Sequence, residues 1–214
     1  MLTESQRLAL EAAWAPARAE GVLGTASILE LDEQAAGFVP AAWRSGPLVG
    51  RAIDLGTGAG VPGVLLAAEL PATRWRLLDA SQRRCDHATA AVHALDLGER
   101  VAVVHARADE LVRSPRTGLE WRGWADLVVT RLFGPPAETA ECSLPLVRLG
   151  GRVVVSVSAA TAAQWRGADL GTLGGAVVDD WSTSAGRYIA LERVAPGEPG
   201  FPRRTARRRR DPLF

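Results

Sequence analysis

The sequence predicts an α/β protein with a mostly parallel sheet of seven strands and helices on both faces of that sheet. From residue 51 onward, short apolar runs alternate with helical stretches, which is typical of a parallel sheet covered on both sides. Two later apolar runs lie close enough to pair as a hairpin, so one edge is expected to carry an antiparallel strand. The chain has 214 residues, 47% of them hydrophobic, which suits one domain with a full core.

Each strand is expected where a short apolar run stands between helical stretches or turns. The seven expected strands cover residues 51–55, 74–79, 101–106, 125–130, 151–158, 175–181 and 186–194. Helices are expected over residues 62–70 and 81–97, and a further helix contains Gln164 and Trp165.

Two helical segments are expected ahead of the first strand. Each can begin with a capping box, in which a hydroxyl side chain bonds the backbone N–H three residues on and the side chain there bonds back. The residue pairs that can form these boxes are Thr3 with Gln6 and Ser27 with Glu30.

Charge is distributed unevenly along the chain. All 25 basic residues are arginine, so a mechanism that needs a lysine is excluded. The formal net charge is +1, but residues 1–50 carry six acids and three arginines, whereas residues 197–214 carry six arginines and two acids. With the expected elements, this divides the chain into a small N-terminal helical extension (1–47), a main domain (48–196) and a basic C-terminal tail (197–214).

The composition also bounds the location of the protein. No apolar run reaches the roughly 18 residues of a membrane span, and the first residues lack the basic start and apolar centre of a signal peptide. The two cysteines, Cys85 and Cys142, give neither a disulfide framework nor a metal-ligand spacing. We expect a soluble cytoplasmic protein with no metal site and no membrane contact, of unknown oligomeric state.

The glycine-rich loop after the first expected strand, IDLGTGAGVPG, fits two cofactor patterns. Gly58, Gly60 and Gly63 satisfy the G-x-G-x-x-G fingerprint of dinucleotide-binding proteins. Gly56, Gly58 and Gly60 satisfy a tighter G-x-G-x-G pattern, preceded by Asp54, which is associated with methyltransferases that use S-adenosylmethionine (SAM). Both patterns place backbone close to a nucleotide cofactor.

The position of the acid favours the second pattern. The strand ends near Leu55, so Gly56 is the first residue of the turn, and Asp54 places a carboxylate at the strand tip. A carboxylate is unfavourable beside a pyrophosphate but suits a cofactor with an ammonium and a sulfonium group. We therefore expect a class I, Rossmann-like SAM methyltransferase fold, in which Gly63 serves close helix packing.

Further residues downstream agree with a nucleoside cofactor. Asp79 ends the second strand 19 residues after Gly60, where an acid can accept both ribose hydroxyls. Asp109 follows the third strand and can accept a hydrogen bond from the adenine amino group, with Ala108 leaving room for the ring. Arg131 follows the fourth strand and is the residue predicted for catalysis, either holding the cofactor carboxylate or orienting the acceptor.

These stretches together resemble a known family. The resemblance runs from about residue 51 onward, through DLGTGAGVPGVLLA, LLDASQRR, ARADEL, VVTRLFG, PLVRLGGRVVV and FPRRTARRRRDPL, and points to the glucose-inhibited division protein B family. It implies a SAM-dependent methyltransferase that acts on a guanine N7 of 16S ribosomal RNA. With the residues above, the predicted cofactor-binding set is Asp54, Gly56, Thr57, Gly58, Gly60, Val61, Asp79, Ala80, Ala108, Asp109 and Arg131.

The acceptor is less defined than the cofactor. The chain lacks the Asn-Leu-Thr and His-x-x-Asp-Ser-Leu stretches of the family, and Ser156, Val157 and Ser158 stand where a lysine is common. A small-molecule or protein acceptor, or a non-catalytic cofactor binder, therefore stay as alternatives. If the partner is 16S ribosomal RNA or the small ribosomal subunit, its phosphates are expected to contact Arg203, Arg204, Arg207, Arg208, Arg209 and Arg210.

Overall fold

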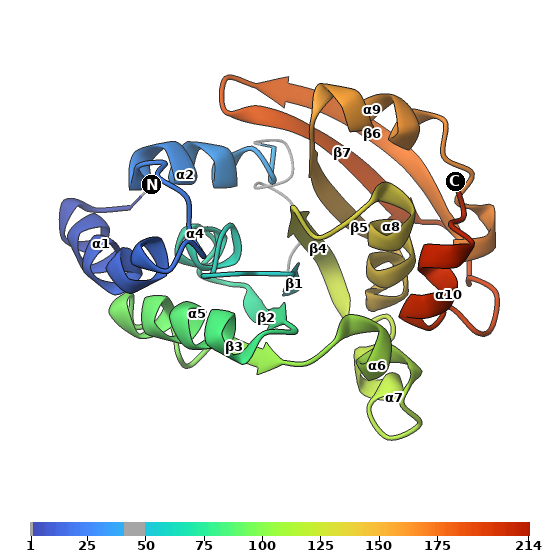
Figure 1. The fold of residues 1–214 in the computed structure, drawn as a ribbon, viewed down its shortest axis with the longest axis horizontal. Helices are drawn as coiled ribbons and strands as arrows, with labels where there is room; N and C mark the ends of the chain where they lie inside the picture. Colours follow the sequence, from blue (N-terminus) through green and yellow to red (C-terminus); the bar gives the residue numbers. More distant parts are fainter. Residues whose placement is uncertain (1, 41–49) are drawn as a thin grey trace.

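A computed structural model describes residues 2–40 and 50–214, and its centre is one seven-stranded sheet in the order β3-β2-β1-β4-β5-β7-β6 (Figure 1). The strands are β1 Arg51–Leu55, β2 Arg74–Asp79, β3 Val101–His105, β4 Ala125–Arg131, β5 Val147–Val157, β6 Gly175–Thr183 and β7 Gly186–Arg193. Strands β1 to β5 pair in parallel, and β7 pairs antiparallel with both β5 and β6. The predicted α/β fold with a terminal hairpin is therefore confirmed.

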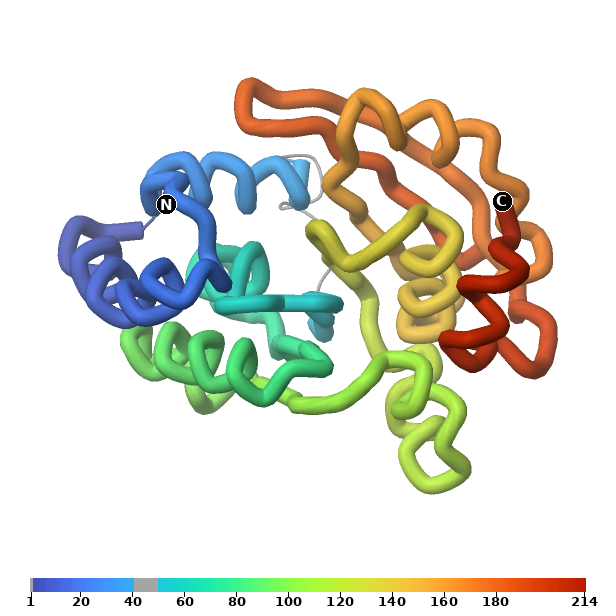
Figure 2. The backbone as a smooth tube through the Cα atoms, viewed as in Figure 1, coloured from blue at the N-terminus to red at the C-terminus, as the bar shows by residue number. Residues whose placement is uncertain are grey.

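Helices cover both faces of the sheet. They are α1 Glu4–Ala19, α2 Ile28–Ala36, α4 Gly63–Glu69, α5 Gln82–Ala94, α6 Ala108–Arg113, α7 Gly118–Trp121, α8 Pro136–Ser143, α9 Ala159–Arg166 and α10 Thr205–Arg210. Within the described ranges, α1, α2, α4 and α5 pack on one face, and α6 to α9 pack on the other (Figure 2). Strand β1 alternates between these layers, since Ala52 belongs to the first and Ile53 and Leu55 to the second.

The two N-terminal helices are part of the core. Both predicted capping boxes form, with the Gln6 N–H donating to Thr3 Oγ1 and the Glu30 N–H donating to Ser27 Oγ. Helix α1 packs along α5, and its Trp14 is completely buried. The expected boundary at residue 47 lies outside the described residues, so the division into 1–47, 48–196 and 197–214 stays a prediction.

Several elements differ from the expectation, and the helices α8 and α10 were not predicted. Strand β5 begins at Val147, four residues before the predicted start, and an irregularity in its pairing with β4 follows Ala125. The link before β4 contains two short helices, α6 and α7, which extend from the lower edge of the molecule in Figure 1. Of the helices described, none is both long and apolar enough to cross a membrane.

Candidate functional site

The glycine-rich loop joins β1 to α4 and turns sharply at its first residue. Gly56 has a φ of +76°, a conformation that favours glycine. A Cβ atom on Gly56 would lie 2.8 Å from Cδ2 of Phe133, so this glycine also allows the aromatic ring to approach the backbone. The next turn is held from the neighbouring strand, because the Gly58 N–H donates to Asp79 Oδ2 at 3.0 Å.

Asp54 lies beneath this loop and holds it from inside. Its Oδ2 accepts hydrogen bonds from Thr57 Oγ1 at 2.7 Å and from the Gly63 N–H at 2.8 Å. A Cβ atom on Gly63 would lie 2.4 Å from Leu77 Cδ2 and 2.6 Å from Asp54 Oδ2, so the predicted role of Gly63 in close packing is confirmed. The other oxygen, Asp54 Oδ1, is buried with no hydrogen-bond partner among the described residues.

The electrostatic state of Asp54 follows from this burial. Desolvation raises the pKa of its carboxyl from the ordinary 3.8 to about 7, while the bonds from Thr57 and Gly63 act in the opposite direction. The nearby negative charge of Asp79 raises this pKa further, and the positive charge of Arg131 lowers it. A cationic group brought near Asp54 would favour its ionised form.

Helix α1 supports the loop from the outer side. The Trp14 indole Nε1–H donates to the backbone carbonyl of Ala59 at 2.7 Å, across 45 residues of sequence. Because both groups are buried, this bond fixes the centre of the glycine-rich loop against α1. No local pattern in the sequence indicates that Trp14 has this partner in the loop.

A cavity of about 240 Å³ opens beside the loop at the carboxyl ends of β1 to β4, and we call it the carboxyl-edge cavity. Five predicted residues line it: Gly56, Asp79, Ala80, Ala108 and Asp109. Such an edge is where open α/β sheets bind ligands. Predicted residues from the ends of three strands, β1, β2 and β3, thus meet at one cavity, while their role in cofactor binding stays a prediction.

The remaining predicted residues lie outside the cavity lining. Thr57, Gly58, Gly60 and Val61 form the loop itself, and the lining does not include them. Arg131 ends β4, where its backbone pairs with Ser156 of β5, and its half-buried side chain makes no hydrogen bond or ion pair with another described residue. Burial lowers the pKa of its guanidinium, and the negative charge of Asp54 acts in the opposite direction.

The two residues after Arg131 do line the cavity. Leu132 has a φ of +56° and is 86% exposed, although a leucine rarely adopts this backbone conformation. Phe133 packs over Gly56. An exposed leucine and an aromatic ring thus present an apolar surface at the cavity, and strained backbone of this kind often accompanies a functional site.

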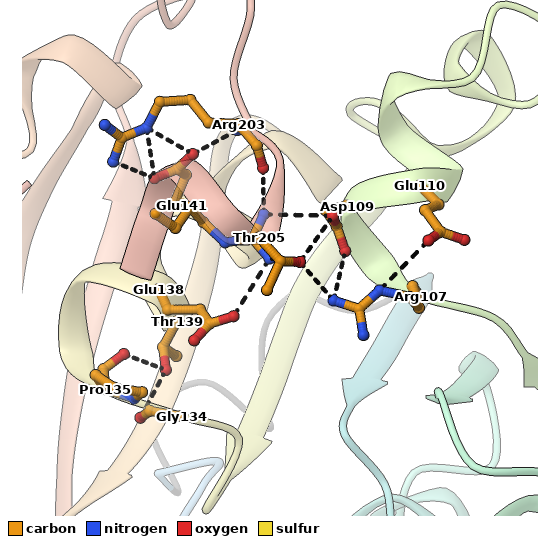
Figure 3. A network of polar contacts seen from close by, with 11 residues as sticks. Arg107, Asp109, Glu110, Gly134, Pro135, Glu138, Thr139, Glu141, Arg203 and Thr205 are labelled. Atoms are coloured by element: carbon orange, nitrogen blue, oxygen red, sulfur yellow. Dashed lines mark hydrogen bonds and ion pairs between the residues drawn. The ribbon is translucent and has the colours of Figure 1, made fainter. Parts of the chain in front are cut away.

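The basic C-terminal tail packs against the wall of the carboxyl-edge cavity through buried ion pairs (Figure 3). Arg203 forms four contacts with Glu141 of α8: Nε lies 3.1 and 3.2 Å from the two carboxylate oxygens, Nη2 lies 2.8 Å from Oε2, and its backbone N–H donates to Oε1. Arg208 Nη2 donates to Glu138 at 3.2 Å, and Nη1 lies 3.5 Å from Asp109 Oδ2.

The expectation that Arg203 and Arg208 contact RNA phosphates is therefore wrong. Both side chains are buried, because the carboxylates of α6 and α8 would otherwise lie in the interior without a counter-charge. The four arginines that stay exposed are Arg204, Arg207, Arg209 and Arg210.

Sequence reasoning missed several residues at the cavity. Arg84, Arg107, Leu132 and Glu138 line it, and none was assigned to the site. Arg107 and Leu132 stand directly beside residues that were predicted, so adjacency is a usable signal for them. Glu138 lies on α8, and nothing in the sequence separates it from an ordinary surface acid.

The histidines and cysteines have structural roles where the structure defines them. His87 Nε2 lies 3.2 Å from Glu20 Oε2 and so joins α5 to the end of α1. Both Cys85 and Cys142 are buried, and desolvation raises the pKa of the Cys142 thiol to about 12. Among the residues described, no group of three or more His, Cys, Asp or Glu side chains could hold a metal ion.

The sheet order, the glycine-rich loop and the carboxylates at the strand ends define a class I methyltransferase fold. The chain superposes on an O-methyltransferase from Bacillus cereus with a TM-score of 0.60 and 14% identity, covering 86% of this chain and 90% of that one. An O-methyltransferase described as putative, from Klebsiella pneumoniae, gives the same score and identity, with 87% and 90% covered. At these identities the likeness concerns the fold.

The family follows from the sequence comparisons. The family model described as rRNA small subunit methyltransferase G matches residues 44–171, and the chain belongs to this family. A Ribosomal RNA small subunit methyltransferase G from Synechococcus sp. (strain JA-2-3B'a(2-13)) is 34% identical over 76% of this chain and 64% of its own length. Another from Salinispora tropica is 34% identical over 72% of this chain and 67% of its own. The chain thus spans about two thirds of each of these relatives.

Proposed function

We propose that this chain is a SAM-dependent methyltransferase that transfers a methyl group to a guanine N7 of 16S ribosomal RNA. The observation that carries the proposal is the extent of the family match. Residues 44–171 include the glycine-rich loop, Asp79, Asp109 and Arg131, and every residue of the carboxyl-edge cavity except Arg208 and Arg209. The names of the relatives supply the substrate class.

The residues present fit this cofactor. Asp79 and Asp109 supply acceptors for hydroxyl and amino groups, and Ala108, which also lines the cavity, has a small side chain that leaves room for a ring. The unpaired oxygen of the buried Asp54 favours a cationic group near the loop. One structural neighbour, the O-methyltransferase from Bacillus cereus, was solved in complex with SAH, the demethylated cofactor S-adenosylhomocysteine.

The cofactor would supply a methyl group activated by its sulfonium, and the protein would supply position. Guanine N7 carries a free lone pair and no proton, so the transfer needs no general base. Arg131 would hold the cofactor carboxylate or orient the acceptor, because its half-buried guanidinium has no other partner among the described residues. Leu132 and Phe133 offer apolar surface on which a base can stack. Fixing both reactants can account for a large part of the rate enhancement.

The RNA would be bound partly through phosphates. Arg204, Arg207, Arg209 and Arg210 are exposed, and the planar fork of arginine matches two phosphate oxygens. Contacts of this kind add affinity that depends on salt but not on sequence. A cytoplasmic location, where ribosomal RNA is made in bacteria, belongs to this proposal.

One experiment tests both cofactor and acceptor. Protein and labelled SAM are incubated with small ribosomal subunits, or with naked 16S RNA, from a bacterial strain lacking this methylation. The RNA is then digested and 7-methylguanosine is measured by mass spectrometry. Label in 7-methylguanosine supports the proposal, and SAM binding without RNA methylation favours a small-molecule or protein acceptor. A chain that binds a nicotinamide dinucleotide but not SAM would contradict both.

A further inference from the structure

Helix α10 forms part of the wall of the carboxyl-edge cavity. Arg208 and Arg209 line the cavity together with Asp109 and Glu138. We propose that α10 is a positioning element, which holds the Asp109 carboxylate through Arg208 and Thr205 so that it recognises the amino group of adenine. This inference rests on the proposed function, because the adenine is that of SAM.

The contacts to Asp109 are asymmetric. Two groups of α10 meet the same oxygen, Oδ2: the Thr205 hydroxyl at 3.3 Å and Arg208 Nη1 at 3.5 Å. The other oxygen, Oδ1, has Arg107 Nη2 at 3.3 Å. A carboxylate oxygen can accept two hydrogen bonds, so Oδ1 keeps capacity for a further donor while Oδ2 is held from α10.

Arg107 links this arrangement back to α10. Its Nη2 donates to Thr205 Oγ1 at 2.6 Å, so that the hydroxyl accepts from Arg107 and donates to Asp109. Arg107 directly precedes α6, and Thr205 begins α10. Arg107, Asp109 and Thr205 therefore contact one another in a closed triangle, in which the first two come from the start of α6 and the third from α10.

Arg208 differs from its neighbours on the same helix. Its side chain is 3% exposed, whereas Arg207 and Arg210 are exposed. One guanidinium reaches Asp109 of α6, Glu138 of α8 and the backbone carbonyl of Arg203. A planar fork with several donors can join three acceptors in this way, which a lysine cannot do with the same geometry.

The segment is anchored at both ends of α10, so the helix can act as a fixed wall. Before the helix, Arg203 is paired with the buried Glu141. After it, Leu213 packs against the core of the α6–α9 layer, and the Phe214 ring lies 6.0 Å from that of Trp165. Since a short helix of six residues is not stable alone, these anchors hold α10 in place.

The test compares two ligands that differ at position 6 of the purine, where a carbonyl oxygen and a protonated N1 replace the adenine amino group and its unprotonated N1. Dissociation constants for SAH and for its inosine analogue, S-inosylhomocysteine, are measured by calorimetry on the full chain, Arg208→Gln and Arg207→Gln. The wild-type chain is expected to prefer SAH by roughly 10- to 100-fold, the range for a hydrogen bond to a charged group. In Arg208→Gln this preference is expected to fall about tenfold, as for coupled neighbours, and in Arg207→Gln it is unchanged.

The ratio of the two dissociation constants distinguishes a loss of positioning at Asp109 from a general loss of structure, which would weaken both ligands alike. If Arg208→Gln prefers SAH over S-inosylhomocysteine as strongly as the wild-type chain does, whatever the absolute affinities, α10 does not position Asp109 and the inference is overturned. Should this variant fail to fold, Thr205→Val removes the other donor to Oδ2 without leaving a buried charge unpaired, and an unchanged preference there overturns the inference as well. A wild-type chain that binds neither ligand overturns the proposed function and this inference together.

Discussion

Replacing Arg203 by methionine would leave the Glu141 carboxylate in the interior without a counter-charge. Glu141 is 1% exposed and the Arg203 side chain is 9% exposed, so water does not screen this pair. Removing one partner of a buried ion pair typically costs about 3–5 kcal/mol, much of it the desolvation of the charge that stays behind. We expect Arg203→Met to lose an amount in this range.

The geometry sets an upper limit to the loss. Three contacts of the Arg203 guanidinium with Glu141 and one with the exposed Asp211 disappear, while the backbone N–H of residue 203 still donates to Glu141. If the segment around α10 detaches, Glu141 becomes hydrated and the penalty stops growing. The measured loss therefore cannot exceed the free energy with which this segment is docked.

Two assays distinguish a global loss from local detachment. Thermal unfolding should shift by roughly 6–20 °C if the loss appears in the global transition, at about 2–4 °C per kcal/mol for a chain of this size. Trypsin reports on detachment, because Arg207 and Arg209 lie in the docked segment, are present in both the variant and its control, and become cleavable when the segment leaves the surface. Arg204→Met serves as the matched control, since Arg204 is exposed.

A double variant checks the assigned cause. Arg203→Met combined with Glu141→Gln removes both charges and keeps an acceptor for the backbone N–H, so most of the lost stability should return. The reasoning is refuted if Arg203→Met behaves like Arg204→Met in both assays. It is also refuted if the double variant is less stable than Arg203→Met alone.

Three further predictions concern the loop and the strand end. Gly63→Ala should cost about 1–3 kcal/mol in urea unfolding, because its Cβ would lie 2.4 Å from Leu77 Cδ2, whereas Gly24→Ala meets open space and should be neutral. The pKa of Asp54 is raised from 3.8 in the unfolded chain to about 7, so between these values the folded chain holds a proton that the unfolded chain releases. The free energy of unfolding of the wild-type chain should therefore decrease as the pH rises from about 4 to about 7, and Asp54→Asn should remove this decrease. Arg131→Gln should weaken SAH roughly 10- to 100-fold but leave methylthioadenosine, which lacks the carboxylate, unaffected; equal losses would exclude a carboxylate contact.

Local sequence patterns were sufficient to predict the strands of the sheet and the positions of Asp79 and Gly63 beside the glycine-rich loop. Strand β2 begins and ends at the residues expected, because its apolar run is bounded by turn residues on both sides. Asp79 was found because the distance from a glycine-rich loop to the next strand tip is fixed by one helix and two turns. Gly63 was assigned to packing because the acid at position 54 made the alternative pattern unfavourable.

Contacts between segments that are far apart in the sequence could not be predicted from local sequence patterns. Trp14 reaches the loop carbonyl of Ala59 across 45 residues, and periodicity can say only that such a side chain is buried. Arg208 stands in a run of four arginines, and a run of like charges is normally a solvated surface. Its burial depends on carboxylates at Asp109 and Glu138, whose proximity follows from the sheet order and not from spacing along the chain.

The arginines of the basic C-terminal tail therefore fall into two groups, buried and exposed, with different expected functions. A buried guanidinium is held by fixed carboxylates, so its contribution should respond weakly to salt, whereas exposed arginines bound to phosphate lose affinity steeply as salt rises. Raising the salt concentration would thus weaken RNA binding through Arg207 or Arg210 but leave the cofactor selectivity assigned to Arg208 nearly unchanged. These residues are nevertheless neighbours on one helix. Because Arg208 and Arg209 of α10 line the cavity while Arg207 and Arg210 are exposed, the same short helix would connect the two binding events.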